Sequence, residues 1–140
     1  MATTVYLSNP NVTINSVALQ DQCTSAVVNY VYEQLETTSF GDTARKFGGS
    51  AVTSLQNNTI EVTLYQSYAA SETEATIFGL TGIVTTIIVA PATGIVGSTN
   101  PFYTLVGCYL QSHTPINASL GELSEVTLTF AGGVLTKTTS

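Results

Sequence analysis

Hydrophobic and polar residues alternate with a period of two along much of this chain, as they do in half-buried β-strands. The clearest case is the segment 124–131, in which Val126, Leu128 and Phe130 alternate with Thr127 and Thr129. Other segments have the same alternation or a short run of β-branched and aromatic residues. These patterns predict strands at 12–15, 28–33, 60–64, 83–90, 102–112, 124–131 and 134–138. The Gly132-Gly133 pair supplies a tight turn between the last two strands.

One segment has helical character instead. Ser71-Glu72-Thr73-Glu74 has the form of a capping box, in which the Ser71 hydroxyl and the Glu74 carboxylate bind backbone N–H groups at the start of a helix. We expect a helix of about two and a half turns from there to Leu80, ended by Gly82. The predicted fold class is therefore mainly β: an antiparallel β-sandwich or partly closed barrel with one flanking α-helix.

The segment 36–50 breaks the alternation and predicts a long loop between the second and third strands. It contains three glycines, two phenylalanines and Arg45-Lys46, which are two of the three basic residues in the chain. Two aromatic rings in a glycine-flanked loop are too apolar to stay exposed, so we expect them to be buried at a subunit interface. The predicted contact residues are Phe40, Gly41, Asp42, Arg45, Lys46 and Phe47.

Charged side chains are scarce, which changes the interpretation of the surface. They make up 9% of the 140 residues, against about 25% in an ordinary protein, and 3 basic and 9 acidic residues give a net charge of −6. Phosphate-neutralising nucleic-acid binding is excluded, because it needs clustered Lys and Arg. The 24 Thr and 13 Ser residues must cover the surface instead. Such a surface suits a chain covered by other subunits, where unpaired buried charges are unfavourable, and it also suits a secreted β-sandwich.

Candidate chemistry is sparse. His113 is the only histidine, and no C-x-x-C or H-x-x-H spacing is present, so no metal site and no cofactor are expected. We interpret His113 as a loop residue that follows the strand 102–112. A Ser–His–Asp triad is defined by geometry, but no G-x-S-x-G elbow occurs and nothing singles out one serine. The sequence therefore predicts no catalytic residue and a protein that is not an enzyme.

Signals for export and membrane insertion are not found either. Residues 1–5 lack the basic and apolar regions of a signal peptide, which indicates synthesis and folding in a cytosol. We therefore expect Cys23 and Cys108 to be free thiols. The uncharged stretch 77–97 contains Pro91, several threonines and a β-branched run typical of a buried strand, so we expect no membrane span.

Four blocks of sequence, taken in order, carry a family resemblance. They are NVTINSVAL, VVNYVYEQLETTSFGDTARKF, IEVTLYQSYAASETEATIFGL and STNPFYTLVGCYLQSHTPINASLGELSEVTLTFAGGVLTKTT. Their order resembles the major tail, or tail tube, proteins of long-tailed bacteriophages over nearly the whole chain. The closest local match is the last block, where Asn100-Pro101 opens a strand and LGELSEVTLTF and GGVLTKTT follow.

The resemblance implies one tail-tube-like domain over 1–140 that assembles into hexameric rings. Sheets of adjacent subunits would join into a continuous barrel around a channel, and stacked rings would form the tube that conducts the viral genome. The loop at 37–50 would reach toward the neighbouring ring, and the N-terminal arm and C-terminal end would take part in stacking. The partners would be copies of the chain, other tail proteins at the tube ends and DNA in transit, within a virion tail made in a host bacterial cytoplasm.

The net charge fits such an assembly. A ring of six would carry 6 × −6 = −36, and an acidic or neutral channel repels DNA phosphates, so that a duplex slides through it. Glu33, Glu61 and Glu125 alternate with apolar residues and are the candidate channel-facing carboxylates. Arg45-Lys46 has two interpretations, docking on an acidic patch of the next ring and an exposed solubilising pair.

Other classes of protein share these features. A capsid decoration protein or a tail terminator would have the same composition and fold but would form trimers or single rings. A secreted carbohydrate-binding or adhesion sandwich would use some of the seven tyrosines for stacking on sugars, and it would need export.

Overall fold

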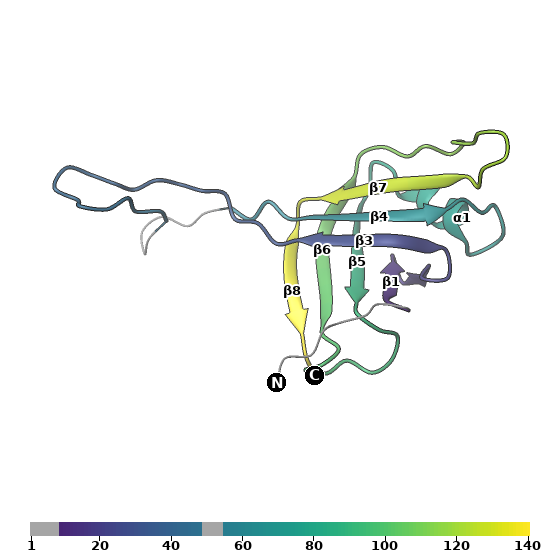
Figure 1. Cartoon of the computed structure of the whole chain (residues 1–140), viewed down its shortest axis with the longest axis horizontal. Helices are drawn as coiled ribbons and strands as arrows, with labels where there is room; N and C mark the ends of the chain where they lie inside the picture. Colours follow the sequence, from purple (N-terminus) through teal and green to yellow (C-terminus); the bar gives the residue numbers. More distant parts are fainter. Residues whose placement is uncertain (1–8, 49–54) are drawn as a thin grey trace.

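The computed structural model describes residues 9–48 and 55–140, and it consists mainly of antiparallel β-strands (Figure 1). One short helix, α1 (Thr73–Ile77), and a 3₁₀ turn, η1 (Phe78–Leu80), follow the fourth strand. The strands are β1 (Asn11–Ile14), β2 (Val17–Ala18), β3 (Cys23–Asn29), β4 (Thr59–Tyr65), β5 (Val84–Ala90), β6 (Phe102–Leu110), β7 (Glu125–Ala131) and β8 (Val134–Thr138). The predicted fold class, mainly β with one flanking helix, is confirmed.

The strands form one sheet that folds over on itself into two layers. Its order is β2-β1-β5-β6-β7-β4-β3, and β8 also pairs with β6. The fold-over occurs at β6, because one edge of this strand pairs with β8 over 102–106 and with β7 at Tyr109 and Leu110. One layer contains β1, β5, β6 and β8, the other contains β3, β4 and β7, and the strands of the two layers cross steeply (Figure 1). The result is a sandwich that is joined along one side and open along the other.

The hydrophobic core fills the space between the layers. In β4 and β7 every second residue points inward, as the sequence alternation predicts. These inward side chains, each at most 1% exposed, are Ile60, Val62, Leu64, Val126, Leu128 and Phe130. Val12, Ile14, Ile87 and Leu105 of the other layer join the same buried cluster, and Ile77 brings α1 into it.

The tight turn at Gly132-Gly133 has a steric cause. Both residues have a positive φ, +82° and +83°, which suits the two central positions of a hairpin turn. A Cβ on Gly133 would lie 2.3 Å from the carbonyl oxygen of Val106, so the turn passes directly over β6. Only glycine fits where β7 and β8 wrap around that strand.

The predicted capping box at the start of the helix is wrong. The helix begins at Thr73, its N-cap residue is Glu72, and no side chain caps it. Ser71 has a φ of +62° and lies one position too early to act as the cap. The Glu74 carboxylate binds His113 instead of the helix N-terminus. The helical segment is therefore shorter than expected, although it ends at Leu80 as predicted.

The second predicted strand is shifted along the chain. It covers Cys23–Asn29 instead of 28–33, because the chain leaves the sheet after Asn29. Val28 packs against the core, but Tyr30 and Tyr32, which the alternation places on the same buried face, are 60% and 49% exposed. The alternation at 28–33 thus continues past the end of β3 into a segment that leaves the two-layered sandwich, which is called the body below.

Candidate assembly surfaces

A long two-stranded ribbon, here called the arm, projects from the body between β3 and β4 (Figure 1). Its described residues are 30–48 and 55–57, and residues 49 and 50 of the predicted loop lie outside the described part. Backbone hydrogen bonds of 2.8 Å join its two sides, from Glu33 N–H to Leu55 O and from Gly48 N–H to Leu35 O. The arm is therefore an ordered ribbon along this length, and it is longer than the predicted loop.

The buried side chain of Asn58 fixes the base of the arm. Its Oδ1 accepts a hydrogen bond from Val31 N–H at 3.0 Å, and its Nδ2 donates to the Gly133 carbonyl at 3.3 Å. The arm is thus anchored to the β7–β8 turn by a fully buried amide. Sequence reasoning missed Asn58, because an asparagine before a strand carries no pattern of its own.

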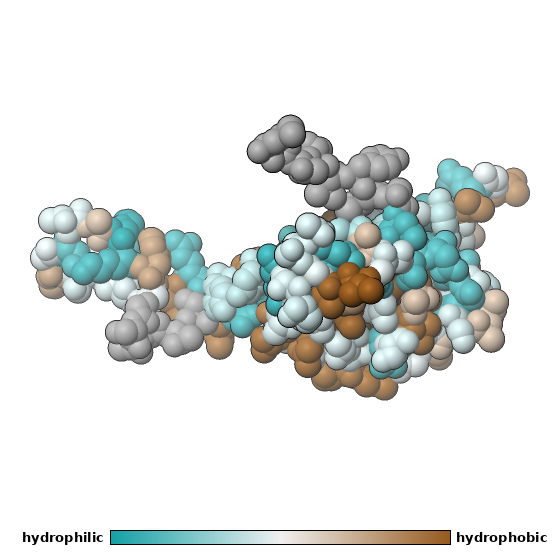
Figure 2. Space-filling view, turned by 90° about the horizontal axis from the view of Figure 1, so that it is seen from below, coloured by the Kyte–Doolittle hydropathy of each residue, from teal (hydrophilic) through white to brown (hydrophobic). Residues whose placement is uncertain are grey.

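Apolar side chains are displayed along the arm. Phe40 is 108% exposed at the tip and Phe47 is 48% exposed, so neither ring is buried by the described part of the chain. Tyr30, Tyr32, Leu35 and Leu55 are also exposed closer to the body. Hydrophobic residues are visible along the arm and in patches on the body in Figure 2. Exposed aromatic and aliphatic side chains gathered in this way are typical of a surface that another protein covers.

The two cations of the arm are paired with acidic residues of the same arm. Arg45 binds Glu36, and Lys46 Nζ lies 2.7 Å from Asp42 Oδ1. Asp42 Oδ2 also accepts a hydrogen bond of 2.7 Å from the Ser39 N–H. The pKa of the Asp42 carboxyl is held below its usual range, mainly by the Lys46 ammonium and next by the Ser39 N–H. The predicted loop residues 40–47 therefore lie together, but their basic groups are neutralised locally.

The three predicted channel-facing carboxylates do not lie on one surface. Glu61 and Glu125 are exposed on the outer face of β4 and β7, where Thr63 and Thr127 lie between them on paired strands. Glu33 lies in the arm, because the strand that was expected to carry it ends at Asn29. The expectation that Glu33 alternates on a sheet face is thus wrong.

The outer faces of the two layers differ in chemistry. The face of β3, β4 and β7 carries mainly hydroxyl and carboxylate groups, and its exposed apolar residue Val27 pairs with Glu61. The outward residues of the other layer are uncharged and include the apolar Val84, Val106 and Val134, which are 64%, 51% and 53% exposed. Val106 and Val134 are direct partners on β6 and β8. The sandwich thus has one acidic, mainly polar face and one uncharged face with exposed valines.

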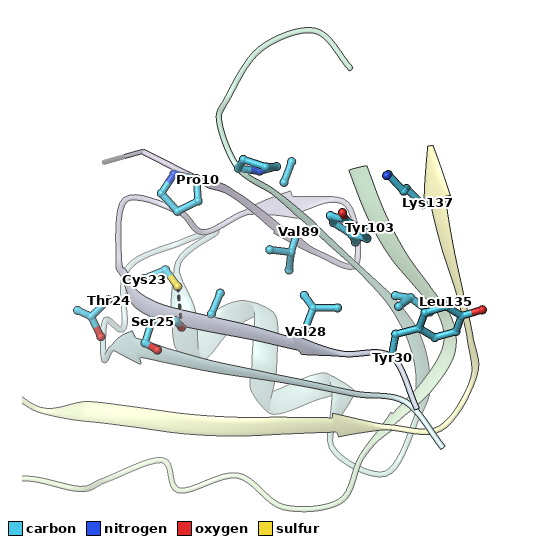
Figure 3. Close-up of a pocket in the computed structure, with 13 residues that line it drawn as sticks. Pro10, Cys23, Thr24, Ser25, Val28, Tyr30, Val89, Tyr103, Leu135 and Lys137 are labelled. Atoms are coloured by element: carbon cyan, nitrogen blue, oxygen red, sulfur yellow. Dashed lines mark hydrogen bonds between the residues drawn. The ribbon is translucent and has the colours of Figure 1, made fainter. Parts of the chain in front are cut away.

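A groove of about 860 Å³ runs along the open side of the sandwich, between the free edge of β3 and the other layer (Figure 3). Val28, Val89, Tyr103 and Leu135 form its apolar floor, and among the described residues Lys137 is the one charged side chain that lines it. The groove exists because no strand in the described part of the chain pairs with the outer edge of β3. Sequence reasoning could not locate it, because which strand is left unpaired depends on the tertiary topology.

Both cysteines are free thiols, as predicted. Cys23 is half-buried at the end of the groove and its thiol donates to the Ser25 carbonyl (Figure 3). Cys108 is fully buried in the core and donates to the Thr85 carbonyl at 3.2 Å. Burial raises the pKa of each thiol, so neither is activated as a nucleophile.

His113, expected as an ordinary loop residue, is buried in a polar network. Its Nε2 lies 2.8 Å from Oε2 of Glu74, and its side chain is only 3% exposed. Gln66 donates to the same carboxylate at 3.2 Å and to the Pro115 carbonyl at 2.6 Å. The network ties α1 to the segment that follows β6. Sequence reasoning missed this pair because 39 residues separate its two members.

Within 9–48 and 55–140, no group of three His, Cys, Asp or Glu side chains is placed to hold a metal ion. Over the same residues, no helix has the length and apolar character that a membrane crossing needs.

No protein-family model and no curated protein matches the sequence. Solved structures match by fold over nearly the whole chain. A chain in the virion of a native gene transfer agent particle superposes with a TM-score of 0.68 at 16% identity, covering 98% of this chain and 99% of that one. The fold is tail-tube-like. A chain of the anti-feeding prophage cap, described as a tube terminating cap, gives a TM-score of 0.67 at 14% identity and covers 100% of this chain and 94% of its own.

A third tail-tube-like match comes from a contractile assembly. A chain of the PVC sheath-tube complex, an extracellular contractile injection system in its extended state, gives a TM-score of 0.66 at 11% identity, with 98% and 93% of the two chains covered. These matches confirm the family resemblance at the level of the fold.

Proposed function

We propose that this chain is a structural subunit of a phage-type tail tube. Copies form hexameric rings, the rings stack, and the resulting channel conducts viral DNA into the host cell. The observation that carries the proposal is the likeness in fold, over the whole chain, to chains of assembled tails and injection systems. One matching chain, with a TM-score of 0.55, comes from the tail of an empty gene transfer agent particle refined with helical C6 symmetry. This symmetry supports the six-membered ring.

The amount of exposed surface supports an assembled state. The isolated chain exposes 8995 Å², whereas a compact monomer of 14.7 kDa exposes about 6,900 Å². The arm adds apolar surface that a monomer leaves in water, including Phe40, Leu35 and Leu55. Contact with other copies removes this surface from water, which is a favourable contribution to assembly. The role is structural and not enzymatic, and the chain resides in the virion tail after synthesis in the bacterial cytoplasm.

The acidic face of β3, β4 and β7 is the face that we assign to the channel. Glu61 and its cross-strand neighbour Thr129 lie on it, together with the Thr63–Thr127 pair, and no Lys or Arg side chain occurs on these three strands. Hydroxyl and carboxylate groups offer DNA phosphates no attractive charge, so the duplex passes without being retained. The uncharged outer face of β5, β6 and β8 then faces away from the channel, toward protein.

A tail terminator is the second candidate. Two matching chains come from a tube terminating cap and from a PVC sheath/tube terminator, both with a TM-score of 0.67. A terminator forms one ring at the end of a tube and does not add further rings. The two candidates therefore differ in whether purified rings continue to grow.

Electron microscopy of the purified full-length chain, combined with a channel variant, tests the proposed function. We expect wild-type tubes of regular axial repeat that do not retain duplex DNA at physiological salt. Tubes of the double variant Glu61→Lys/Thr129→Lys should bind DNA in a salt-dependent manner, whereas tubes of Glu61→Gln should not. Single rings that never stack would support the terminator. Tubes of the lysine variant that bind no DNA would contradict the channel assignment.

A further inference from the structure

The two ends of the molecule differ in the sign of their charged groups, because the arm carries both cations and carboxylates whereas the opposite end is acidic. Arg45 and Lys46, two of the three basic residues, lie near the tip of the arm, and the third, Lys137, lines the groove. The other end of the body, around α1 and the α1-side ends of β4 and β7, lies opposite the arm along the longest axis (Figure 1). Apart from the Glu74–His113 pair, its charged residues are all acidic: Asp21, Glu72, Glu122 and Glu125.

A hollow of about 420 Å³ lies at this second end. It is lined by Tyr65, Asn117, Ser119, Glu122, Leu123 and Glu125, and we call it the acidic hollow. It forms between the end of β4, the start of β7 and the loop that precedes β7. That loop is held in place because Asn117 Nδ2 donates to the Glu125 carbonyl at 3.1 Å and the Ser124 hydroxyl donates to the Asn117 carbonyl at 2.7 Å.

The acidic hollow has unused charge and unused apolar surface. Among the described residues, neither of its two carboxylates takes part in an ion pair. Leu123 in its wall is 75% exposed, and the neighbouring Leu120 is 105% exposed. A partner that fits this surface therefore presents a cation beside an apolar side chain.

We propose that the acidic hollow of one copy receives the arm tip of a second copy. The inference rests on the proposed tube function and names the surface to which the arm binds. Arg45 and Lys46 of the incoming arm face Glu122 and Glu125, and the Phe40 ring packs on Leu123. The complement of the acidic hollow is a cation beside an apolar side chain. The chain has only three basic residues, and the arm of another copy carries two of them beside exposed aromatic rings.

The ion pairs within the arm do not prevent this docking. The side chains of Arg45 and Lys46 are 75% and 63% exposed even though each is paired. The Arg45–Glu36 pair is exposed at both partners and contributes little to stability, so Arg45 can turn toward a second carboxylate. The Asp42 side chain is only 14% exposed, so Lys46 keeps this partner and offers its remaining N–H donors to the second carboxylate. The contact joins two different ends of the chain, and such a head-to-tail contact adds copies without closing on itself along the stacking direction.

A charge-exchange experiment tests the proposal. The arm variant is Arg45→Glu/Lys46→Glu, and the hollow variant is Glu122→Lys/Glu125→Lys. Each alone should raise the critical concentration for tube growth by at least about tenfold, while circular dichroism shows that both remain folded. An equimolar mixture should restore growth, because the acidic arm of one variant fits the basic hollow of the other. The matched control, Asp21→Lys/Glu72→Lys, changes the same charge at the same end outside the hollow and should grow like wild type.

The outcomes separate the docking site from the tube function. If the folded hollow variant grows like wild type, or if the mixture fails to restore growth, the docking site is wrong even when wild-type tubes form. If wild-type copies never form tubes but the two variants associate with each other and not with themselves, the docking stands and the tube function fails.

Discussion

Oε2 of Glu74 lies 2.8 Å from Nε2 of His113, which places a carboxylate from α1 against a ring from the segment after β6. The ring is 3% exposed and the carboxylate side chain 19%, so water replaces neither partner easily. The Phe78 and His113 rings meet in an edge-type contact, with their centroids 6.5 Å apart. This pair holds the helix onto the sandwich, a role that a capping box would not have supplied.

Removal of the Glu74 carboxylate should destabilise the folded chain. Glu74→Ala removes the carboxylate partner of the buried His113 and one of the two acceptors of Gln66, which should lower the free energy of unfolding by about 1–3 kcal/mol. The control Glu72→Ala removes a neighbouring carboxylate that caps nothing and should change it by less than about 0.5 kcal/mol. Urea unfolding of the unassembled chain measures both. Equal losses in the two variants would contradict the role of the pair.

The two glycines of the β7–β8 turn should respond differently to alanine. Gly132→Ala places a Cβ in open space, so the only penalty is that alanine must adopt the left-handed backbone conformation. This should lower the free energy of unfolding by about 1–2 kcal/mol. Gly133→Ala adds a collision with the Val106 carbonyl and should destabilise the chain at least twice as much. Thermal unfolding compares them. A loss for Gly133→Ala no larger than that for Gly132→Ala would mean that the turn does not press on β6.

Asp42 should titrate below the usual range of an aspartate. Because its pKa is lowered in the folded arm, the ionised Asp42 stabilises the arm tip at and above the ordinary Asp pKa. This stabilisation is lost as the pH falls through the lowered pKa. Carboxyl-carbon NMR titration of Asp42 measures this directly. Lys46→Gln should raise the pKa toward its usual range, whereas Lys137→Gln, remote from the arm, should leave it unchanged. An unshifted Asp42 in the wild-type chain would refute the local pairing.

The two cysteines report on the groove. In unassembled protein, a thiol reagent should modify half-buried Cys23 and spare Cys108, which serves as an internal control. The rate for Cys23 should continue to rise above the usual thiol pKa, because burial raises its pKa and delays thiolate formation. If sheets of adjacent copies join across the open side, modification should slow on assembly, measured by mass spectrometry. An unchanged rate in tubes would show that the groove stays open.

Phe40 should matter to assembly and not to folding. Its ring is fully exposed in the isolated chain, so Phe40→Ser should leave the free energy of unfolding nearly unchanged. Burial of a phenylalanine contributes about 1.5–3 kcal/mol, so the critical concentration for assembly should rise about ten- to hundredfold. Phe40→Leu keeps an apolar side chain, so it should raise the critical concentration for assembly much less. Hydroxyl-radical footprinting with equal modification of Phe40 in free and assembled protein would rule the contact out.

The sequence predicted the sandwich where local pattern and burial coincide. In β4 and β7 the alternation of apolar and polar residues matches the inward and outward faces, because each strand has one face on the core. The same rule failed at 28–33. There Tyr30 and Tyr32 alternate as a strand does but lie on the arm, and nothing local distinguishes a ribbon in water from a strand in a sheet.

The surfaces of the chain were less accessible to prediction than its core. The part of the arm that begins at residue 36 was predicted as a loop from its glycines, whereas its anchor, Asn58, and the Glu74–His113 pair depend on contacts between distant segments. The groove depends on β3 being left without a second partner, which is a property of the strand order and not of any strand.

A cryo-electron microscopy reconstruction of the assembled full-length chain tests the central claim most directly. The account predicts stacked six-membered rings around an open channel lined by the outer face of β3, β4 and β7, with Glu61 at its surface and each arm reaching the next ring. A chain that stays a single, unassociated subunit at millimolar concentration, or a channel lined by the face of β5, β6 and β8, would contradict it.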